Sequence, residues 1–180
     1  MKMSVTIKKM ETDAEIRGKA LVHWRAWHEA YAGLVSPDYL DKLTLERCEK
    51  MAFSWPDNTV VAKDGERVLG FVAWGDRGEE VPGIGEIFAL YVASEYYGTG
   101  VAQRLMDAGL ERLRDYPTVC LWVLKENKRA IRFYEKCGFR PDGTEEYHAN
   151  LAAEEIRMTL ERKTRPQGAR PAPYDEKAVS

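Results

Sequence analysis

Two glycines lie where the chain leaves an apolar strand and enters a helix, and their spacing indicates a site for a charged ligand. Residues 86–93 are apolar after the first, and Gly98 and Gly100 precede apolar residues at helical spacing. The first turn of a helix carries unpaired backbone N–H groups and about half a positive charge, which favours bound anions. Glycines there also leave room for a phosphate beside the backbone. The pattern predicts a diphosphate site; the alternative is that the glycines only permit a tight turn.

Two other phosphate-binding motifs do not fit this stretch. A dinucleotide fingerprint requires G-x-G-x-x-G near a first strand, with an acidic residue about 20 positions later, and Gln103 occupies the place of the third glycine. A P-loop requires Gly-Lys followed by Ser or Thr, which is absent. Neither of these two motifs therefore accounts for the glycine turn.

Two ordered blocks of sequence carry a resemblance to a known family. The first is EIFALYV at 86–92 followed by YGTGVA at 97–102 and Leu105. The second is LWVLKEN at 121–127, then Ala130, FYEK at 133–136 and GF at 138–139. Together they resemble the acyl-coenzyme A signature and the later motif of the GNAT superfamily of N-acetyltransferases. The resemblance is tight over about 84–140 and looser at 27–34, and it departs at Tyr97, where the family usually has Gln or Arg.

The resemblance implies an acetyl-coenzyme A site in a V-shaped opening, where the central strand parts from its neighbour. Strand residues would contact the acyl arm, the glycine turn and helix start would hold the diphosphate, and a later helix would contact coenzyme A from the other side. In that order, the implied residues are Leu90, Tyr91 and Val92, then Gly98, Thr99, Gly100, Val101, Ala102 and Gln103, then Asn127, Ala130 and Phe133.

The resemblance also implies two catalytic residues. An alkyl amine has a pKa of about 10.4, so at neutral pH it needs a base, and the departing thiolate needs a proton. Glu86 matches the general-base glutamate of lysine-acetylating members, and Tyr134, seven residues after Asn127, matches the tyrosine that protonates the thiolate. Alternatively, Glu86 is a solvated carboxylate and Tyr134 a core aromatic. A strand N–H near Leu90 or Val92 is expected to stabilise the charged carbonyl oxygen.

The residues that bind the acceptor are less defined. Trp27 and Tyr31 are most simply core residues, but the first helices of the family wall the acceptor pocket, so both are candidates for substrate contact. Small amines, polyamines, amino acids, antibiotics, protein N-termini and lysines all stay open as acceptors. His23, His28 and His148 form no triad or metal set and are interpreted as packing or surface residues, so no metal is expected.

Composition and charge indicate which partners and which cellular location to expect. With 27 basic and 29 acidic residues the net charge is −2, which argues against a nucleic-acid partner. Three cysteines without metal or disulfide spacing fit a reducing cytosol. The longest apolar run, 87–93, is too short to cross a membrane, and the start lacks a signal-peptide pattern, so a cytoplasmic protein without a membrane partner is expected.

The predicted elements mix hairpins with helical crossovers. They predict an α/β (α+β) fold with a mixed, mostly antiparallel sheet of about six to seven strands and helices on both faces; the resemblance makes this the GNAT fold. One domain is expected at 1–160, with a flexible tail at 161–180. The predicted strands are 4–10, 59–62, 67–74, 86–93, 119–124 and 155–160, and the predicted helices are 13–33, 37–53, 101–113 and 127–137.

The sequence thus predicts an N-acetyltransferase that moves acetyl from acetyl-coenzyme A to a primary amine of a small molecule or protein in a ternary complex. An alternative from another class is a coenzyme A-binding sensor or interaction module with little turnover, for which Tyr97 is the only indication. A longer-chain acyltransferase is a second enzymatic alternative. Exposed sheet edges leave a homodimer open.

Overall fold

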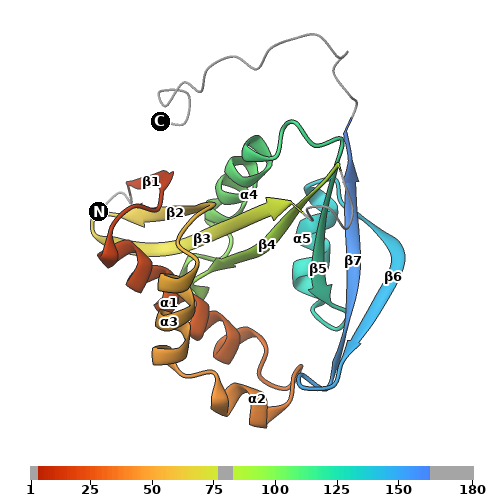
Figure 1. Cartoon of the computed structure of the whole chain (residues 1–180), viewed down its shortest axis with the longest axis horizontal. Coiled ribbons are helices and arrows are strands. Elements are labelled where there is room, and N and C mark those ends of the chain that lie inside the picture. Colours follow the sequence, from red (N-terminus) through yellow and green to blue (C-terminus); the bar gives the residue numbers. More distant parts are fainter. Residues whose placement is uncertain (1–3, 77–82, 163–180) are drawn as a thin grey trace.

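A seven-stranded sheet runs through the protein in the order β1-β2-β3-β4-β5-β7-β6 (Figure 1). The computed structural model describes residues 4–76 and 83–162. Every neighbouring pair is antiparallel except β4 and β5, which are parallel. This confirms the predicted mixed, mostly antiparallel sheet. The strands are β1 (Val5–Lys9), β2 (Thr59–Asp64), β3 (Arg67–Asp76), β4 (Ile84–Val92), β5 (Thr118–Leu124), β6 (Arg140–His148) and β7 (Ala153–Glu161).

Helices cover both faces of this sheet, as predicted. The helices are α1 (Asp13–Ala30), α2 (Pro37–Lys42), α3 (Leu45–Ser54), α4 (Val101–Arg112) and α5 (Lys128–Lys136), with a short 3-10 turn at Ser94–Tyr96. Alternate residues of each strand point to opposite faces, so Val61 and Phe71 pack with α1 and α3, whereas Val60 and Val72 pack with α4. Figure 1 shows α1, α2 and α3 gathered on one side and α4 and α5 on the other.

The segment predicted as one helix over 37–53 is two helices. Leu43 leaves the helical region, with φ −86° and ψ 74°, and its side chain is buried. The Thr44 side chain then accepts a hydrogen bond from the Arg47 backbone N–H at 3.2 Å and starts α3 as its N-cap. The apolar spacing continues across the break because Leu43 is still directed into the core, which is why the pattern alone predicted no interruption.

Strand β6 was not predicted. It lies at the edge of the sheet, pairs with β7 alone, and most of its side chains are exposed, so it lacks an alternating apolar pattern. Pro141 and Gly143 argue against a central strand, but an edge strand tolerates both because one side of its backbone needs no partner. The hairpin of β6 and β7 makes one wall of the second cavity described below.

A buried carboxylate fixes helix α1 against two strands. Glu15 forms a capping box with Thr12 at the start of α1, and its side chain is 2 % exposed. Its Oε1 lies 2.9 Å from Lys8 Nζ and 3.0 Å from Lys63 Nζ. Burial alone would raise the pKa of Glu15, but the two lysines and backbone N–H donors lower it to about 2. The carboxylate therefore stays charged and holds the helix that carries Trp27.

The last described residues lie at the predicted boundary between the domain, 1–160, and the tail, 161–180. Strand β7 runs to Glu161, and the Arg162 side chain donates to the backbone oxygens of Leu110 and Leu113. The predicted tail lies outside the described residues from position 163 onward. Across 4–76 and 83–162, the structure contains no helix with the length and apolar character needed to span a membrane.

Candidate active site

Strands β4 and β5 pair for only part of their length. Their parallel register runs from Ile84 opposite Thr118 to Ile87 opposite Leu121, although β4 continues to Val92. On its other edge β4 stays paired with β3, with a bulge at Phe88. The backbone of residues 88–92 therefore borders an opening on the β5 side, where an extended ligand can pair with the strand.

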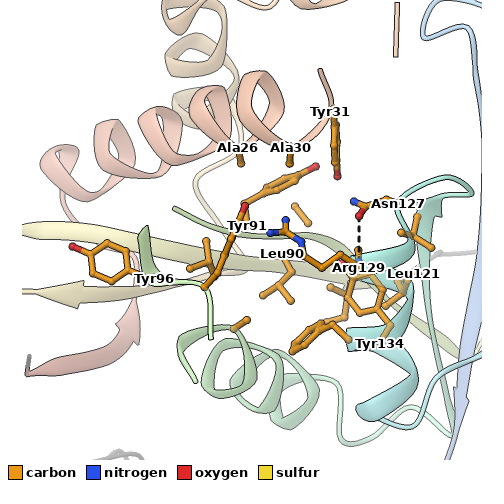
Figure 2. Close-up of a pocket in the computed structure, with 18 of the residues that line it drawn as sticks. Ala26, Ala30, Tyr31, Leu90, Tyr91, Tyr96, Leu121, Asn127, Arg129 and Tyr134 are labelled. Atoms are coloured by element: carbon orange, nitrogen blue, oxygen red, sulfur yellow. Dashed lines mark hydrogen bonds between the residues drawn. The ribbon is translucent and has the colours of Figure 1, made fainter. Parts of the chain in front are cut away.

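A cavity of about 260 Å³ fills this opening between β4, α1 and α5 (Figure 2). Figure 2 shows Tyr31 on the α1 side of the cavity and Tyr134 on the α5 side, with Tyr91 between them. Most of the lining is apolar. The predicted site residues that line it are Tyr31, Leu90, Tyr91, Val92, Gly98, Gly100, Ala102, Asn127, Ala130, Phe133 and Tyr134.

The glycine turn provides an open backbone at one end of this cavity. Gly98 and Gly100 have φ values of +75° and +86°, which favour glycine, and a Cβ at either position would meet no atom within 4 Å. Gly100 is the N-cap of α4 and has no side chain to satisfy the first N–H groups of that helix. The Thr99 hydroxyl donates to the Tyr96 carbonyl oxygen at 2.6 Å and closes the turn. An anion can approach these N–H groups without a clash.

Several predicted cofactor residues have side chains engaged elsewhere. Val101 is 1 % exposed and packs in the core. The Gln103 side-chain amide donates to Asp107 Oδ1 at 2.8 Å. Asn127 caps α5, accepting from the Ala130 N–H at 3.2 Å, the dashed line in Figure 2. For Val101 and Gln103, the backbone N–H is thus the group available to a ligand, whereas the Thr99 N–H donates to the Tyr96 carbonyl oxygen at 3.3 Å.

A cation lies beside the residue that departs from the family pattern. The guanidinium carbon of Arg129 is 3.8 Å from the centroid of the Tyr97 ring, a cation–π contact. Arg129 lines the cavity, and Figure 2 shows its side chain directed toward the middle. Sequence reasoning did not single out Arg129, because its pairing with Tyr97 joins α5 to a turn 32 positions earlier.

Tyr134 is suited to donate a proton. It lies on α5 within an aromatic group, with its ring centroid 5.5 Å from that of Phe133 and 6.2 Å from that of Phe139. Burial, with a smaller contribution from Tyr91, raises the pKa of Tyr134 well above that of a free phenol. The hydroxyl therefore keeps its proton at neutral pH.

A second cavity, of about 350 Å³, lies on the α1 face of the sheet and adjoins the first. The two share part of their lining: Tyr31, Phe88, Tyr91, Trp122 and Val123. The second cavity is otherwise lined by Trp27, Glu86, Leu124, Glu146, His148 and Glu155. The cavities therefore meet where β4 parts from β5.

The aromatic wall of this second cavity is held by direct contacts. Trp27 Nε1 donates to the Tyr91 hydroxyl at 3.0 Å, and the Trp27 ring lies 4.7 Å from that of Tyr31. His23 stacks on Tyr91 with the ring centroids 5.4 Å apart. Burial raises the pKa of Tyr91, which stays neutral. The two predicted substrate residues, Trp27 and Tyr31, thus lie in the second cavity.

The two predicted catalytic residues lie on opposite sides of the meeting point. Glu86 is 8 % exposed and lines the second cavity but not the first. Tyr134 lines the first but not the second. Glu86 therefore borders the second cavity, and Tyr134 borders the first, which also contains the glycine turn.

Sequence reasoning missed three polar residues of the second cavity: Glu146, His148 and Glu155. His148 Nε2 lies 2.9 Å from Glu155 Oε2, and the His148 side chain is 29 % exposed. Burial raises the pKa of Glu155, although His148 acts in the opposite direction. The only signal that could have located these residues is the register of β6 and β7, and β6 was not predicted. Within the described ranges, no group of three or more His, Cys, Asp or Glu is arranged to hold a metal ion.

The chain is similar in sequence to known proteins. An uncharacterised N-acetyltransferase of Bacillus subtilis (strain 168), YuaI, is 27% identical over 156 residues, covering 82% of this chain and 86% of its own. A mycothiol acetyltransferase of Rhodococcus jostii (strain RHA1) is 30% identical over 138 residues, covering 71% of this chain and 40% of its own.

A solved structure shares the fold. The PaiA N-acetyltransferase of Thermoplasma acidophilum, in complex with coenzyme A, has a TM-score of 0.70 and 19% sequence identity, covering 89% of this chain and 100% of its own. The model of the Acetyltransferase (GNAT) family matches residues 21–139, more than half of the chain. The chain therefore belongs to the GNAT family of acetyltransferases.

Proposed function

We propose that this protein is an N-acetyltransferase that transfers acetyl from acetyl-coenzyme A directly to a primary amine of a small molecule or protein. The observation that carries this proposal is the meeting of two cavities at the parting of β4 and β5, with Glu86 facing one and Tyr134 facing the other. Bound acetyl-coenzyme A supplies the acetyl group as a thioester. A ternary complex gives the two reactants the proximity that accelerates the reaction.

The first cavity fits coenzyme A. The diphosphate would lie on the backbone N–H groups at residues 98–103, with Arg129 as the nearby cation. The pantetheine arm would pair with the backbone of β4 along Leu90, Tyr91 and Val92, and a strand N–H there would stabilise negative charge on the carbonyl oxygen. Asn127, Ala130 and Phe133 would border the coenzyme from α5. An open glycine turn, a bare strand edge and an apolar cavity together support this assignment.

Glu86 is the proposed base. A protonated amine cannot act as a nucleophile, so the carboxylate would take its proton, directly or through a water molecule. Trp27 and Tyr31 would orient the acceptor toward the meeting point. As the amine nitrogen bonds to the carbonyl carbon, the carbon–sulfur bond breaks, and the nitrogen releases its second proton to solvent.

Tyr134 is the proposed acid. It would donate its phenolic proton to the departing sulfur and regain one from solvent. The products are an amide and the free thiol of coenzyme A, so atoms and charge balance against an amine and a thioester. The position of Tyr134 in the lining of the first cavity supports this role, and its phenol carries its proton at neutral pH.

An amine-dependent release of thiol tests the proposal. The full chain with acetyl-coenzyme A should release free thiol when a panel of primary amines is added, and acetyl-coenzyme A alone should raise the melting temperature. A thermal shift without thiol release from any amine would favour the coenzyme A-binding sensor instead. Tyr97 is the one indication for a sensor. Because Arg129 places a cation beside Tyr97, the lack of Gln or Arg at position 97 argues less strongly for a sensor.

The acyl-chain preference is part of the same proposal. Acetyl-coenzyme A should outperform propionyl- and succinyl-coenzyme A in the thiol assay, and the reverse order would favour a longer-chain acyltransferase.

The cytoplasmic location, the flexible tail and a homodimer stay predictions.

A further inference from the structure

We propose that the second cavity selects amine acceptors that carry a further positive charge, and that Glu155 binds that charge beside His148. The inference rests on the proposed function, because it takes the second cavity as the place where the acceptor amine binds. It extends that function by assigning the acceptor class: an aliphatic diamine or another amine with a second cationic group.

The charged groups that line the cavity are mainly acidic. Glu86, Glu146 and Glu155 come from β4, β6 and β7, and the other titratable side chains are those of Tyr31, Tyr91 and His148. No lysine or arginine is among the described residues of the lining. The arginine that stacks on Trp122 is Arg157, at 5.9 Å from the ring centroid, and its Nε donates to Asp142 Oδ2 at 2.6 Å.

The sheet register separates Glu86 from Glu155. Glu86 is opposite Cys120 on β5, and Glu155 is opposite Leu124, four positions further along that strand. A strand rises about 3.3 Å per residue, so the two backbone positions are offset by about 13 Å along the strands. Cys120 and Leu124 differ by an even number of positions, so Glu86 and Glu155 share one face of the sheet. The carboxylates therefore approach the cavity from two ends, and one acceptor can contact both.

The Glu155 end of the cavity also holds a histidine. His148 Nε2 is buried, and Glu155 Oε2 lies 2.9 Å from it. An ammonium group at this end of the cavity could donate to the Glu155 carboxylate. The Glu155 side chain is only 25 % exposed, so such a contact is weakly screened by water.

The aromatic wall favours the same chemistry. Trp27, Tyr31, Tyr91 and Trp122 line the same cavity as the carboxylates. Aromatic faces attract cations and also cover an aliphatic chain. A short hydrocarbon chain with an amine at each end would therefore contact carboxylate, ring and carboxylate in turn.

Binding calorimetry tests this inference without requiring turnover. The full chain, saturated with coenzyme A, would be titrated with 1,4-diaminobutane, butylamine and 4-aminobutanoate, which share one amine and differ in the charge at the other end. We expect 1,4-diaminobutane to bind about 10-fold more tightly than butylamine and 4-aminobutanoate to bind most weakly, because a charge-assisted hydrogen bond is among the stronger polar contacts.

Two matched variants locate the effect. Glu155→Gln should remove the advantage of 1,4-diaminobutane over butylamine, whereas Glu154→Gln should retain it. Glu154 is the adjacent residue, is exposed and binds Lys125 at 3.1 Å, so both variants lose one negative charge from the same strand. If Glu155→Gln does not fold, the relative affinities of the three ligands for the wild-type protein still test the inference.

Equal binding of the three ligands, or an intact diamine preference in folded Glu155→Gln, would overturn the inference. The two proposals can fail separately. Charge-selective binding without thiol release from 1,4-diaminobutane would count against acetyl transfer to diamines while the binding site stands. Thiol release from amines without charge-selective binding would leave the acetyltransferase and remove the diamine assignment.

Discussion

The two cavities are assembled from the chain in different ways. The first cavity, the proposed coenzyme cavity, takes its predicted residues mainly from two short stretches, 90–102 and 127–134, each running from a strand or turn into a helix. The second cavity takes its residues from α1, β4, β5, β6 and β7. A site made of continuous segments can be recognised in sequence, whereas a site made by strand register becomes visible only in the fold.

The largest expected effect is at Tyr134, on the coenzyme side. Tyr134→Phe removes one oxygen and with it the proton for the departing thiolate, so kcat should fall about 100-fold. The Kd for coenzyme A, measured by calorimetry, should change little because the ring remains. Tyr147→Phe, a change at an exposed edge position, serves as the control. Wild-type turnover in Tyr134→Phe would refute the role.

Next in size is Glu86, on the other side of the meeting point. Glu86→Gln should lower kcat/KM for the amine about 30-fold and weaken its rise with pH, since the amide cannot take a proton. Coenzyme A binding should be retained, because Glu86 does not line the coenzyme cavity. Steady-state kinetics across pH measure both effects, and full activity with an unaltered pH profile would exclude Glu86 from the mechanism.

The glycine turn is expected to affect coenzyme binding rather than chemistry. Gly100→Ala places a side chain at φ +86° and strains the start of α4, so the Kd for coenzyme A should rise about 10-fold. Gly143→Ala is the matched control, since Gly143 has φ +89° and lies on β6, away from the coenzyme cavity. The two variants should lose similar stability. Equal coenzyme affinity in both would show that the turn does not bind the diphosphate.

A smaller effect is expected at Arg129. Arg129→Ala should weaken coenzyme A binding about 3-fold and reduce its dependence on salt, because a cation near the phosphates is lost. Tyr97→Phe should bind normally, since the ring that supports Arg129 is retained. Calorimetry at two salt concentrations measures both variants. If Arg129→Ala binds as tightly as the wild type, Arg129 does not replace the missing basic residue at position 97.

The smallest effect concerns the stability of the aromatic wall. Burial, and then the charge of Lys19, lowers the pKa of His23 from 6.5 to about 4. The unfolded chain therefore binds more protons than the folded chain between these values. The contribution of His23 to stability is present above pH 6.5 and is lost as the pH falls toward 4. Between pH 7 and pH 5, the free energy of unfolding should drop by about 2 kcal/mol from this residue.

Urea unfolding at both pH values measures this term. His23→Phe keeps an aromatic ring beside Tyr91 but cannot take up a proton, so its pH dependence should be shallower than that of the wild type. The coenzyme cavity does not include His23, and coenzyme A binding should follow the same pH curve in both proteins. An identical loss of stability in both would contradict the role of His23.

The difference between sites made of continuous segments and sites made by strand register also explains which parts of the fold could be predicted from the sequence. The central strand, the glycine turn and the capped helix after Asn127 were predicted because local patterns specify them. The break at Leu43 was missed because a buried leucine continues the apolar spacing across it. Strand β6 was missed because its side chains are mostly exposed, and with it the pairing of His148 and Glu155, which depends on that hairpin.

The most direct test of the central claim is the affinity of a two-part ligand. Coenzyme A joined through a sulfur-linked acetyl bridge to the nitrogen of an alkyl amine would have to occupy both cavities at once, passing between Tyr31, Tyr91 and Trp122. If the cavities meet as described, calorimetry should show that this conjugate binds at least 10-fold more tightly than coenzyme A and competes with both substrates. A conjugate that binds no more tightly than coenzyme A would contradict the account.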